Sequence, residues 1–129
     1  MHKGLFALLT AAVTFLSFGC VGTQYPTGDP RVHLEPSAVH AIQIQQVSLS
    51  STQSETMELQ VFVRSRRTHY QQLEYRTTWF RANGTPLSTA LSKWNRMGLN
   101  PDEVAAITAR APSAEAADFR IQFRQSPQQ

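Results

Sequence analysis

The side chains that most often carry chemistry in proteins are sparse in this sequence and lie far apart along it. His33, His40 and His69 have none of the short spacings that pairs of metal ligands favour. No serine lies in a G-x-S-x-G context, and no glycine-rich phosphate loop is present. Asp102 and Glu103 are neighbours, so in a strand they would face opposite sides, which does not suit an acid–base pair. The sequence therefore predicts neither an enzyme nor a metal or cofactor site.

The single cysteine, Cys20, has a position that indicates covalent modification. It closes the stretch MHKGLFALLTAAVTFLSFGC, in which a short positive start precedes an almost unbroken apolar run. That run has the length of a signal-peptide core and is shorter than the roughly 20 residues of a membrane-spanning helix. The stretch resembles the lipobox of bacterial lipoproteins, which implies a diacylglycerol thioether and an N-acyl chain on Cys20. An ordinary signal peptide and an uncleaved anchor are the alternatives.

The resemblance to lipoproteins also implies a location in the cell and a domain organisation. Val21 stands where inner-membrane lipoproteins of enteric bacteria carry an aspartate. We therefore expect a lipid anchor in the outer membrane, with the protein facing the periplasm. Val32 and Leu34 are compatible with a short edge strand inside a tether rich in proline and glycine. The expected parts are a signal peptide (1–19), the lipidated cysteine and tether (20–36), one domain (37–125) and a disordered tail (126–129).

Apolar and polar residues alternate through much of the expected domain. The pattern covers residues 42–49, with a break in phase at Gln45–Gln46 that predicts a β-bulge, and residues 57–63 and 73–79. Strict alternation is typical of antiparallel sheet with one buried and one wet face. Further strands are expected at 85–87 after an Asn83-Gly84 turn, at 94–99, at 103–109 after an Asn100-Pro101-Asp102 turn, and at 119–123. About seven short strands favour an all-β fold, an antiparallel β-sandwich of two sheets.

The alternative fold has a helix in the last third of the chain. Residues 104–117 are rich in alanine and could pack as a helix on a smaller sheet, but Pro112 would interrupt that helix. Within the sandwich, residues 111–118 are compatible with a single helical turn between the last two strands.

Residues 73–124 resemble the YcfL-like family of small bacterial lipoproteins. Its members carry a Y-x-x-x-W-[FY]-x-x-x-G stretch, a later tryptophan, an A-P-x-x-x-A segment and a closing x-F-R-[IL] strand. The matching residues are Tyr75, Trp79, Phe80, Gly84, Trp94, Ala111, Pro112, Ala116, Phe119, Arg120 and Ile121. The resemblance implies an immunoglobulin-like sandwich that serves as a component or accessory of an envelope assembly, and it implies no catalytic activity.

A cluster of arginines is the first candidate for a contact surface. Arg64, Arg66 and Arg67 lie close together in the sequence, and Arg76 is expected on the neighbouring strand. Such a positive strip would attract anionic lipid headgroups, lipopolysaccharide, peptidoglycan carboxylates or an acidic protein. The alternative is a charged edge that blocks aggregation between sheets.

Aromatic side chains are the second candidate. Phe62 and Phe80 fall on the faces opposite the buried residues of their strands, so the pair is a candidate docking surface, the alternative being that the tether covers them. Trp79 and Trp94 are expected in the core, as tryptophans on alternating faces of sandwiches usually are. The alternative for Trp94 is an exposed position in a glycan-binding site.

These observations favour a non-enzymatic lipoprotein that binds other proteins of the cell envelope. The alternative is a periplasmic module that recognises peptidoglycan or another glycan. A formal net charge of +3 is too small to predict a nucleic-acid partner, which requires a concentrated basic face.

Overall fold

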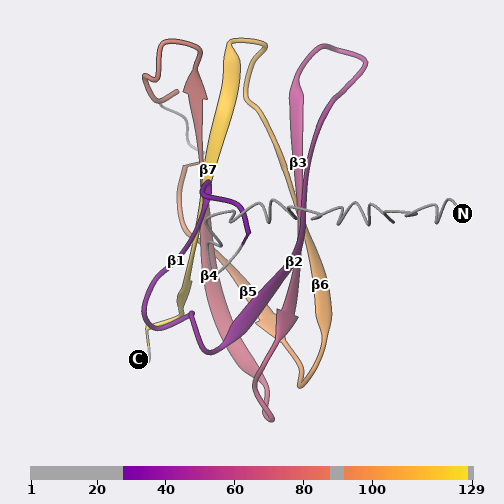
Figure 1. Ribbon diagram of the computed structural model, residues 1–129, viewed down its shortest axis with the longest axis vertical. Coiled ribbons are helices and arrows are strands. Elements are labelled where there is room, and N and C mark those ends of the chain that lie inside the picture. The colour runs from indigo at the N-terminus through magenta and orange to yellow at the C-terminus, as the bar shows by residue number, and fades with distance from the viewer. Residues whose placement is uncertain (1–27, 88–91, 128–129) are drawn as a thin grey trace, which may run out of the picture.

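The computed structural model describes residues 28–87 and 92–127, and these form an all-β sandwich (Figure 1). The predicted signal peptide, Cys20 and the first part of the tether lie outside the described residues. No helix among the residues placed by the structure is long and apolar enough to cross a membrane. The strands are β1 (Val32–Leu34), β2 (Ile42–Ser51), β3 (Met57–Ser65), β4 (Gln71–Arg81), β5 (Asn95–Leu99), β6 (Val104–Arg110) and β7 (Ala116–Gln125).

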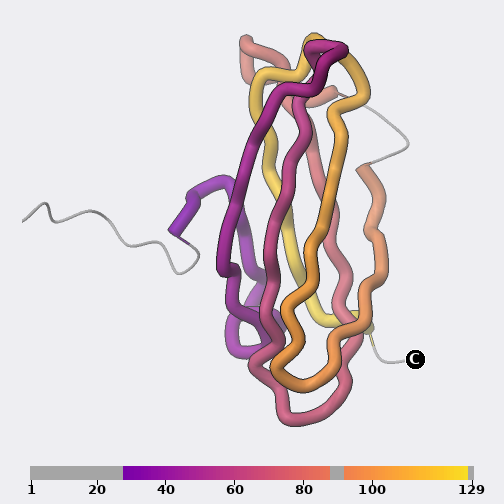
Figure 2. Tube along the Cα trace, turned by 90° about the vertical axis from the view of Figure 1, so that its right-hand side faces the viewer, coloured from indigo at the N-terminus to yellow at the C-terminus, as the bar shows by residue number. Residues whose placement is uncertain are grey.

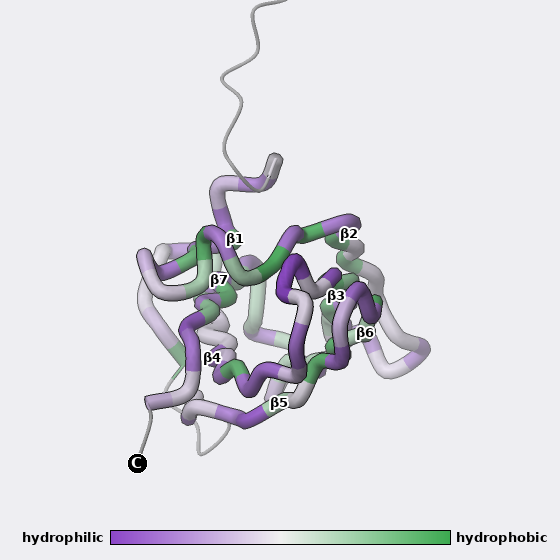
Figure 3. Tube along the Cα trace, turned by 90° about the horizontal axis from the view of Figure 1, so that it is seen from below, coloured by the Kyte–Doolittle hydropathy of each residue, from purple (hydrophilic) through white to green (hydrophobic). Residues whose placement is uncertain are grey.

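The strands form two sheets that pack face to face. The larger sheet has the order β1-β7-β4-β5 and the smaller one the order β2-β3-β6. Figure 2 looks onto the smaller sheet, with the larger sheet behind it, and Figure 3 shows the two layers along the strands. All pairs are antiparallel except β1 and β7, which run parallel. The predicted two-sheet sandwich is therefore confirmed.

The alternating pattern places one side of each long strand in the core. Leu59, Val61 and Val63 of β3 have no exposed surface, while Gln60 between them is exposed. Trp79 of β4 is 2% exposed, and its ring centroid lies 6.1 Å from that of Phe119 on β7. Each such side chain contributes about 1.5–3 kcal/mol by leaving water. Burial between the sheets is what fixes which face of β4 and β7 remains outside.

A predicted β-bulge and two predicted turns are present where the sequence places them. The register between β2 and β3 shifts between Ile44 and Gln46, which confirms the bulge. Gly84 has a φ of 84° in the turn after β4, where the Arg81 amide donates to the Thr85 carbonyl at 2.8 Å. Asp102 has a φ of 61° in the turn before β6, so this turn is confirmed as well.

Three expectations about local structure are wrong, and a fourth is confirmed. Residues 85–87 form no strand but a single bridge between Phe80 and Pro86, in which the Arg81 amide donates to the Thr85 carbonyl and the Leu87 amide to the Trp79 carbonyl; residues 88–91 lie outside the described ranges. The helix over 104–117, and the single helical turn over 111–118, are both wrong. β6 and β7 occupy most of that stretch and are joined by a turn that contains Pro112. The short strand at Val32–Leu34 is present as β1.

Candidate binding surface

On the outer side of the larger sheet, polar and charged side chains of neighbouring strands lie opposite one another in cross-strand pairs. Along β4, Glu74, Arg76 and Thr78 lie opposite Arg124, Gln122 and Arg120 of β7. On the other side of β4, Arg96 of β5 lies opposite Glu74. We call this surface the arginine face, and define it by Glu74, Arg76, Phe80, Trp94, Arg96, Arg120, Gln122 and Arg124.

Trp94 lies on the arginine face and not in the core. The guanidinium carbons of Arg124 and Arg76 are 3.9 Å and 4.8 Å from its ring centroid. Cation–π contacts of this kind contribute about 0.5–2 kcal/mol each. The core position expected for Trp94 is therefore wrong, because it precedes β5 on the same side as Arg96, whereas Leu99 points inward. The core position expected for Trp79 is confirmed.

Glu74 is buried although it points away from the core. Its side chain is 8% exposed, because arginines from both neighbouring strands cover it. Arg124 donates from Nε to Oε2 at 2.7 Å, and its Nη2 lies 2.7 Å from the same oxygen. Arg96 Nε lies 3.5 Å from Oε1. A carboxylate in this position requires such partners, since an unpaired buried charge costs several kcal/mol.

The arginine face is held in place by neutral as well as charged contacts. Arg76 donates from Nε and Nη2 to Gln122 Oε1 at 3.1 and 2.7 Å. Arg120 has no carboxylate within salt-bridge distance among the residues described, and its guanidinium carbon lies 6.0 Å from the Phe80 ring centroid. Two of the four arginines, Arg124 and Arg96, contact Glu74, whereas Arg76 and Arg120 contact no carboxylate among the residues described. Asp118, opposite Phe80 at the end of the face, pairs with Arg31. The face therefore carries an excess of positive charge.

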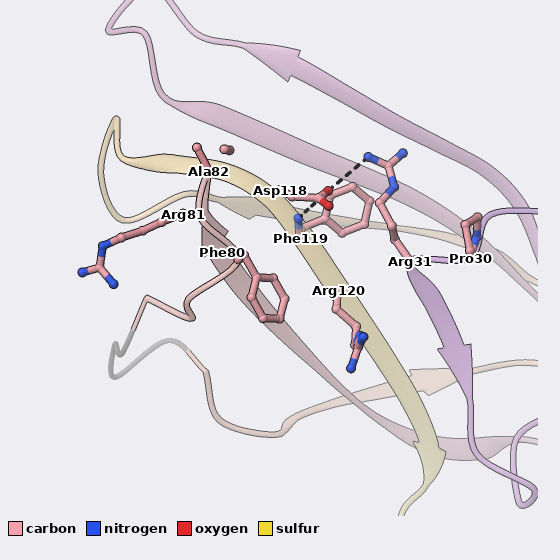
Figure 4. Close-up of a pocket in the computed structure, with 10 residues that line it drawn as sticks. Pro30, Arg31, Phe80, Arg81, Ala82, Asp118, Phe119 and Arg120 are labelled. Carbon is pink, nitrogen blue, oxygen red and sulfur yellow. Dashed lines mark hydrogen bonds and ion pairs between the residues drawn. The ribbon is translucent and has the colours of Figure 1, made fainter.

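A shallow groove of about 630 Å³ adjoins the end of the arginine face where Phe80 and Arg120 lie (Figure 4). Arg31 and Arg81 also line it, but both have acidic partners. Arg31 Nη2 lies 2.9 Å from Asp29 and its Nη1 3.5 Å from Asp118, while Arg81 contacts Glu115 at 3.4 Å and points away from Phe80. The unneutralised cation of the groove is therefore Arg120, in the part of the chain that the structure places.

Asp29 and Arg31, just before β1, form an ion pair. The hydrogen bond from the Arg31 guanidinium holds the pKa of the Asp29 carboxyl below its usual value, against the opposing effect of burial. The same hydrogen bond raises the pKa of Arg31. This pair contacts β7 through Asp118 and so fixes the start of the described chain on the larger sheet.

The opposite end of the larger sheet has a second groove, of about 560 Å³, with a mainly polar lining. Tyr70, 55% exposed, lies at this groove with Gln72, Arg96 and Gln125. The Tyr70 ring occupies the space above Gly98, where a Cβ atom would overlap its hydroxyl group. This groove offers an aromatic ring beside neutral hydrogen-bonding groups.

The predicted strip of Arg64, Arg66, Arg67 and Arg76 is not assembled. Arg64 lies on β3 and Arg76 on β4, and these strands belong to different sheets, because the chain crosses between sheets after Ser65. Arg64 donates from Nε and Nη2 to Asp102 at 2.9 and 2.6 Å. The expectation that Arg76 neighbours the other three is therefore wrong. A contact role for each of these residues stays a prediction.

Phe62 and Phe80 point outward from their strands, as predicted, but on opposite sides of the sandwich. They therefore cannot form one docking surface, and the pairing of the two is wrong. The outer side of the smaller sheet around Phe62 is electrically balanced. Its ion pairs join Glu58 with Arg110 at 2.7 Å and Arg64 with Asp102 at 2.6 Å.

The side chains considered for catalysis lie apart or are engaged in turns. His33, His40 and His69 are exposed, and the described ranges contain no group of three or more His, Cys, Asp or Glu side chains placed to hold a metal ion. Asp102 is paired with Arg64, and Glu103 Oε2 accepts a hydrogen bond from the Asn100 amide at 2.7 Å. The arrangement on the outer faces favours recognition by charge and shape.

Comparison with known proteins identifies a family and two similar folds. The model of the family described as "Protein of unknown function (DUF1425)" matches residues 31–125. A crystal structure of a DUF1425 family member from Shewanella sp. pv-4 has a TM-score of 0.61 and 19% identity, over 68% of this chain and 81% of that chain. The crystal structure of Campylobacter jejuni cj0090 has a TM-score of 0.62 and 18% identity, over 76% of this chain and 100% of that chain. At these identities the likeness shows the fold alone. No curated protein matches the chain.

Proposed function

We propose that this chain, which belongs to the DUF1425 family of proteins of unknown function, is a non-enzymatic binding protein of the cell envelope. In this proposal Cys20 is lipidated and anchors the domain to the outer membrane on the periplasmic side, as in YcfL-like lipoproteins. Confinement to a membrane plane raises the effective concentration of the domain for partners in the same plane. The domain then acts as an accessory component of an envelope assembly.

The arginine face is the observation that supports binding. It combines four arginines with Trp94 and Phe80 on one side of a rigid sheet. Arginine and tryptophan are enriched among the residues that dominate the energy of protein interfaces. The outer side of the smaller sheet has balanced charges instead. A partner protein is therefore expected on the larger sheet.

Site-specific photocrosslinking in cells tests this proposal. The protein carries a photoreactive phenylalanine analogue at Phe80, on the arginine face, or at Phe62, an outward half-buried aromatic residue on the opposite side. We expect one dominant envelope protein to be captured from position 80 and little from position 62. Capture should also fall when Cys20→Ala removes the anchor. Equal capture from both positions, or none from either, contradicts the proposal.

Recognition of peptidoglycan or another glycan is the second candidate, and the groove at Tyr70 is the observation that favours it. An exposed ring beside amide groups, here Gln72 and Gln125, suits a sugar with apolar and hydroxyl-bearing faces. Soluble muropeptides should then raise the melting temperature of the protein, and Tyr70→Ala should abolish the shift. If the shift occurs and position 80 captures no protein, the glycan function replaces the protein-binding one.

A further inference from the structure

We infer that the arginine face binds an acidic segment of a partner protein, through carboxylates that engage Arg76, Arg120 and Arg124. The inference rests on the proposed function, since it names the chemistry of the partner that would occupy the same surface. It depends on three properties of the face: unsatisfied positive charge, arginines that are already ordered, and aromatic rings beside them.

The positive charge on the face is only partly used by the protein itself. Glu74 is 8% exposed and engaged by two of the four arginines, Arg124 and Arg96, and Asp118, opposite Phe80 at the end of the face, is paired with Arg31. Arg76 has a neutral acceptor, the amide of Gln122. Arg120 is exposed and has no acidic partner within the described ranges. A ligand with several carboxylates would therefore complement the face.

The guanidinium groups retain donors for such a ligand. Each guanidinium has five N–H donors. Arg76 and Arg124 direct Nε and Nη2 to neighbours within the sheet, which leaves Nη1 of each without a hydrogen bond inside the described structure. Carboxylates can bind these atoms without breaking the contacts that hold the side chains.

Ordering before binding lowers the cost of association. Immobilising a long side chain at an interface costs about 0.5–1.5 kcal/mol. Gln122 already holds Arg76, Glu74 holds Arg124, and Trp94 lies against both guanidinium groups. We expect most of that entropy to be lost during folding, so a partner gains the charge-assisted hydrogen bonds at a smaller cost.

The composition of the face favours a protein over a lipid surface. Each lysine or arginine near an anionic membrane surface contributes about 1 kcal/mol, so a lipid surface does not select arginine over lysine. All four cations of this face are arginines, whose planar fork matches a carboxylate in a bidentate manner. Trp94 and Phe80 lie directly beside these arginines, an arrangement typical of protein-interface hot spots.

The test measures binding of the full chain, purified in a non-ionic detergent, to a fluorescent peptide of glutamate residues by anisotropy. We expect binding that weakens with added salt, and a dissociation constant raised about fivefold to tenfold by Arg120→Gln. Arg110→Gln is the matched control, because Arg110 is an exposed arginine on the smaller sheet. It should change the dissociation constant less than about twofold, as expected of an exposed charge away from the site. Thermal melts of both variants establish that they are folded.

Three results overturn the inference. One is that Arg110→Gln and Arg120→Gln weaken peptide binding equally. Another is that a serine peptide of the same length binds as well as the glutamate peptide. The third is that glycerophosphoglycerol, a lipid headgroup, binds in an Arg120-dependent way while the peptide does not, which assigns the face to lipid. Capture of a protein from Phe80 without binding of the peptide leaves the proposed function standing and removes this inference alone.

Discussion

Replacing Thr77 with valine should stabilise the domain. Thr77 lies on the inner side of β4, in line with Leu73 and Trp79, and is 6% exposed. Its hydroxyl oxygen is buried and has no hydrogen-bond partner in the described structure. Valine has nearly the same shape and keeps the β-branched side chain that suits a strand. The substitution therefore removes an unsatisfied polar atom while preserving the packing.

The magnitude follows from the burial of this hydroxyl. A buried donor or acceptor without a partner costs about 1–3 kcal/mol. A methyl group in the same place adds about 0.8 kcal/mol of apolar burial. Allowing for imperfect packing, we expect the free energy of unfolding to rise by about 1–2 kcal/mol. In a domain of this size, each additional kcal/mol of unfolding free energy raises Tm by about 4–8 °C.

Urea unfolding of the wild type, Thr77→Val and Thr78→Val measures the effect. Thr78 is the matched control, because it undergoes the same chemical change on the outer side of the same strand. Its variant should shift the free energy by no more than about 0.5 kcal/mol. If Thr77→Val is destabilised, the Thr77 hydroxyl has a hydrogen-bond partner and the reasoning is refuted. If both variants shift the free energy equally, the experiment measures strand propensity alone.

Three further predictions concern the arginine face and its surroundings. Glu74→Ala should destabilise the domain by about 2 kcal/mol in thermal unfolding, because Arg124 loses the carboxylate that holds it; no change would mean that the pair is not formed in solution. Gly98→Ala should cost less than about 1 kcal/mol and raise the rate of chemical nitration of Tyr70, because the exposed ring can move aside; a larger loss would contradict a mobile ring. The lowered pKa of Asp29 means that its stabilising effect is present above about pH 4 and is lost as pH falls through the folded pKa. The stability difference between wild type and Asp29→Asn should therefore shrink between pH 7 and pH 3, and a difference independent of pH would refute this.

The strands and their buried sides were predictable because burial imposes a period of two residues. Leu59, Val61 and Val63 alternate strictly with polar residues, so both the strand and its inner face follow from the sequence. The pairing of strands was not predictable in the same way. β3 and β4 follow one another closely in the chain and could have formed a hairpin, yet they lie in different sheets. Whether β3 and β4 form a hairpin or lie in different sheets, the alternation of apolar and polar residues within each strand is the same.

The arginine face was missed for the same reason, although part of its signal is present in the sequence. Arg120 and Arg124 alternate with buried Phe119, Ile121 and Phe123, which indicates that both point outward. Their assembly with Arg76 depends on β7 lying beside β4, which no local pattern specifies. The burial of an outward-facing glutamate at position 74 likewise results from arginines on two other strands, and only the pairing of strands reveals it.

The position of β7 also has a consequence for the order in which the protein assembles. This strand comes last in the chain, yet it lies between β1 and β4 and is hydrogen-bonded to both. The larger sheet therefore cannot close until residues 116–125 have been synthesised, and pairing between such distant segments is slow compared with local folding. The larger sheet, and with it the arginine face, therefore stays unformed while the preceding residues are being synthesised. Closure of the larger sheet and assembly of the arginine face would then arise together, once residues 116–125 pair with β1 and β4.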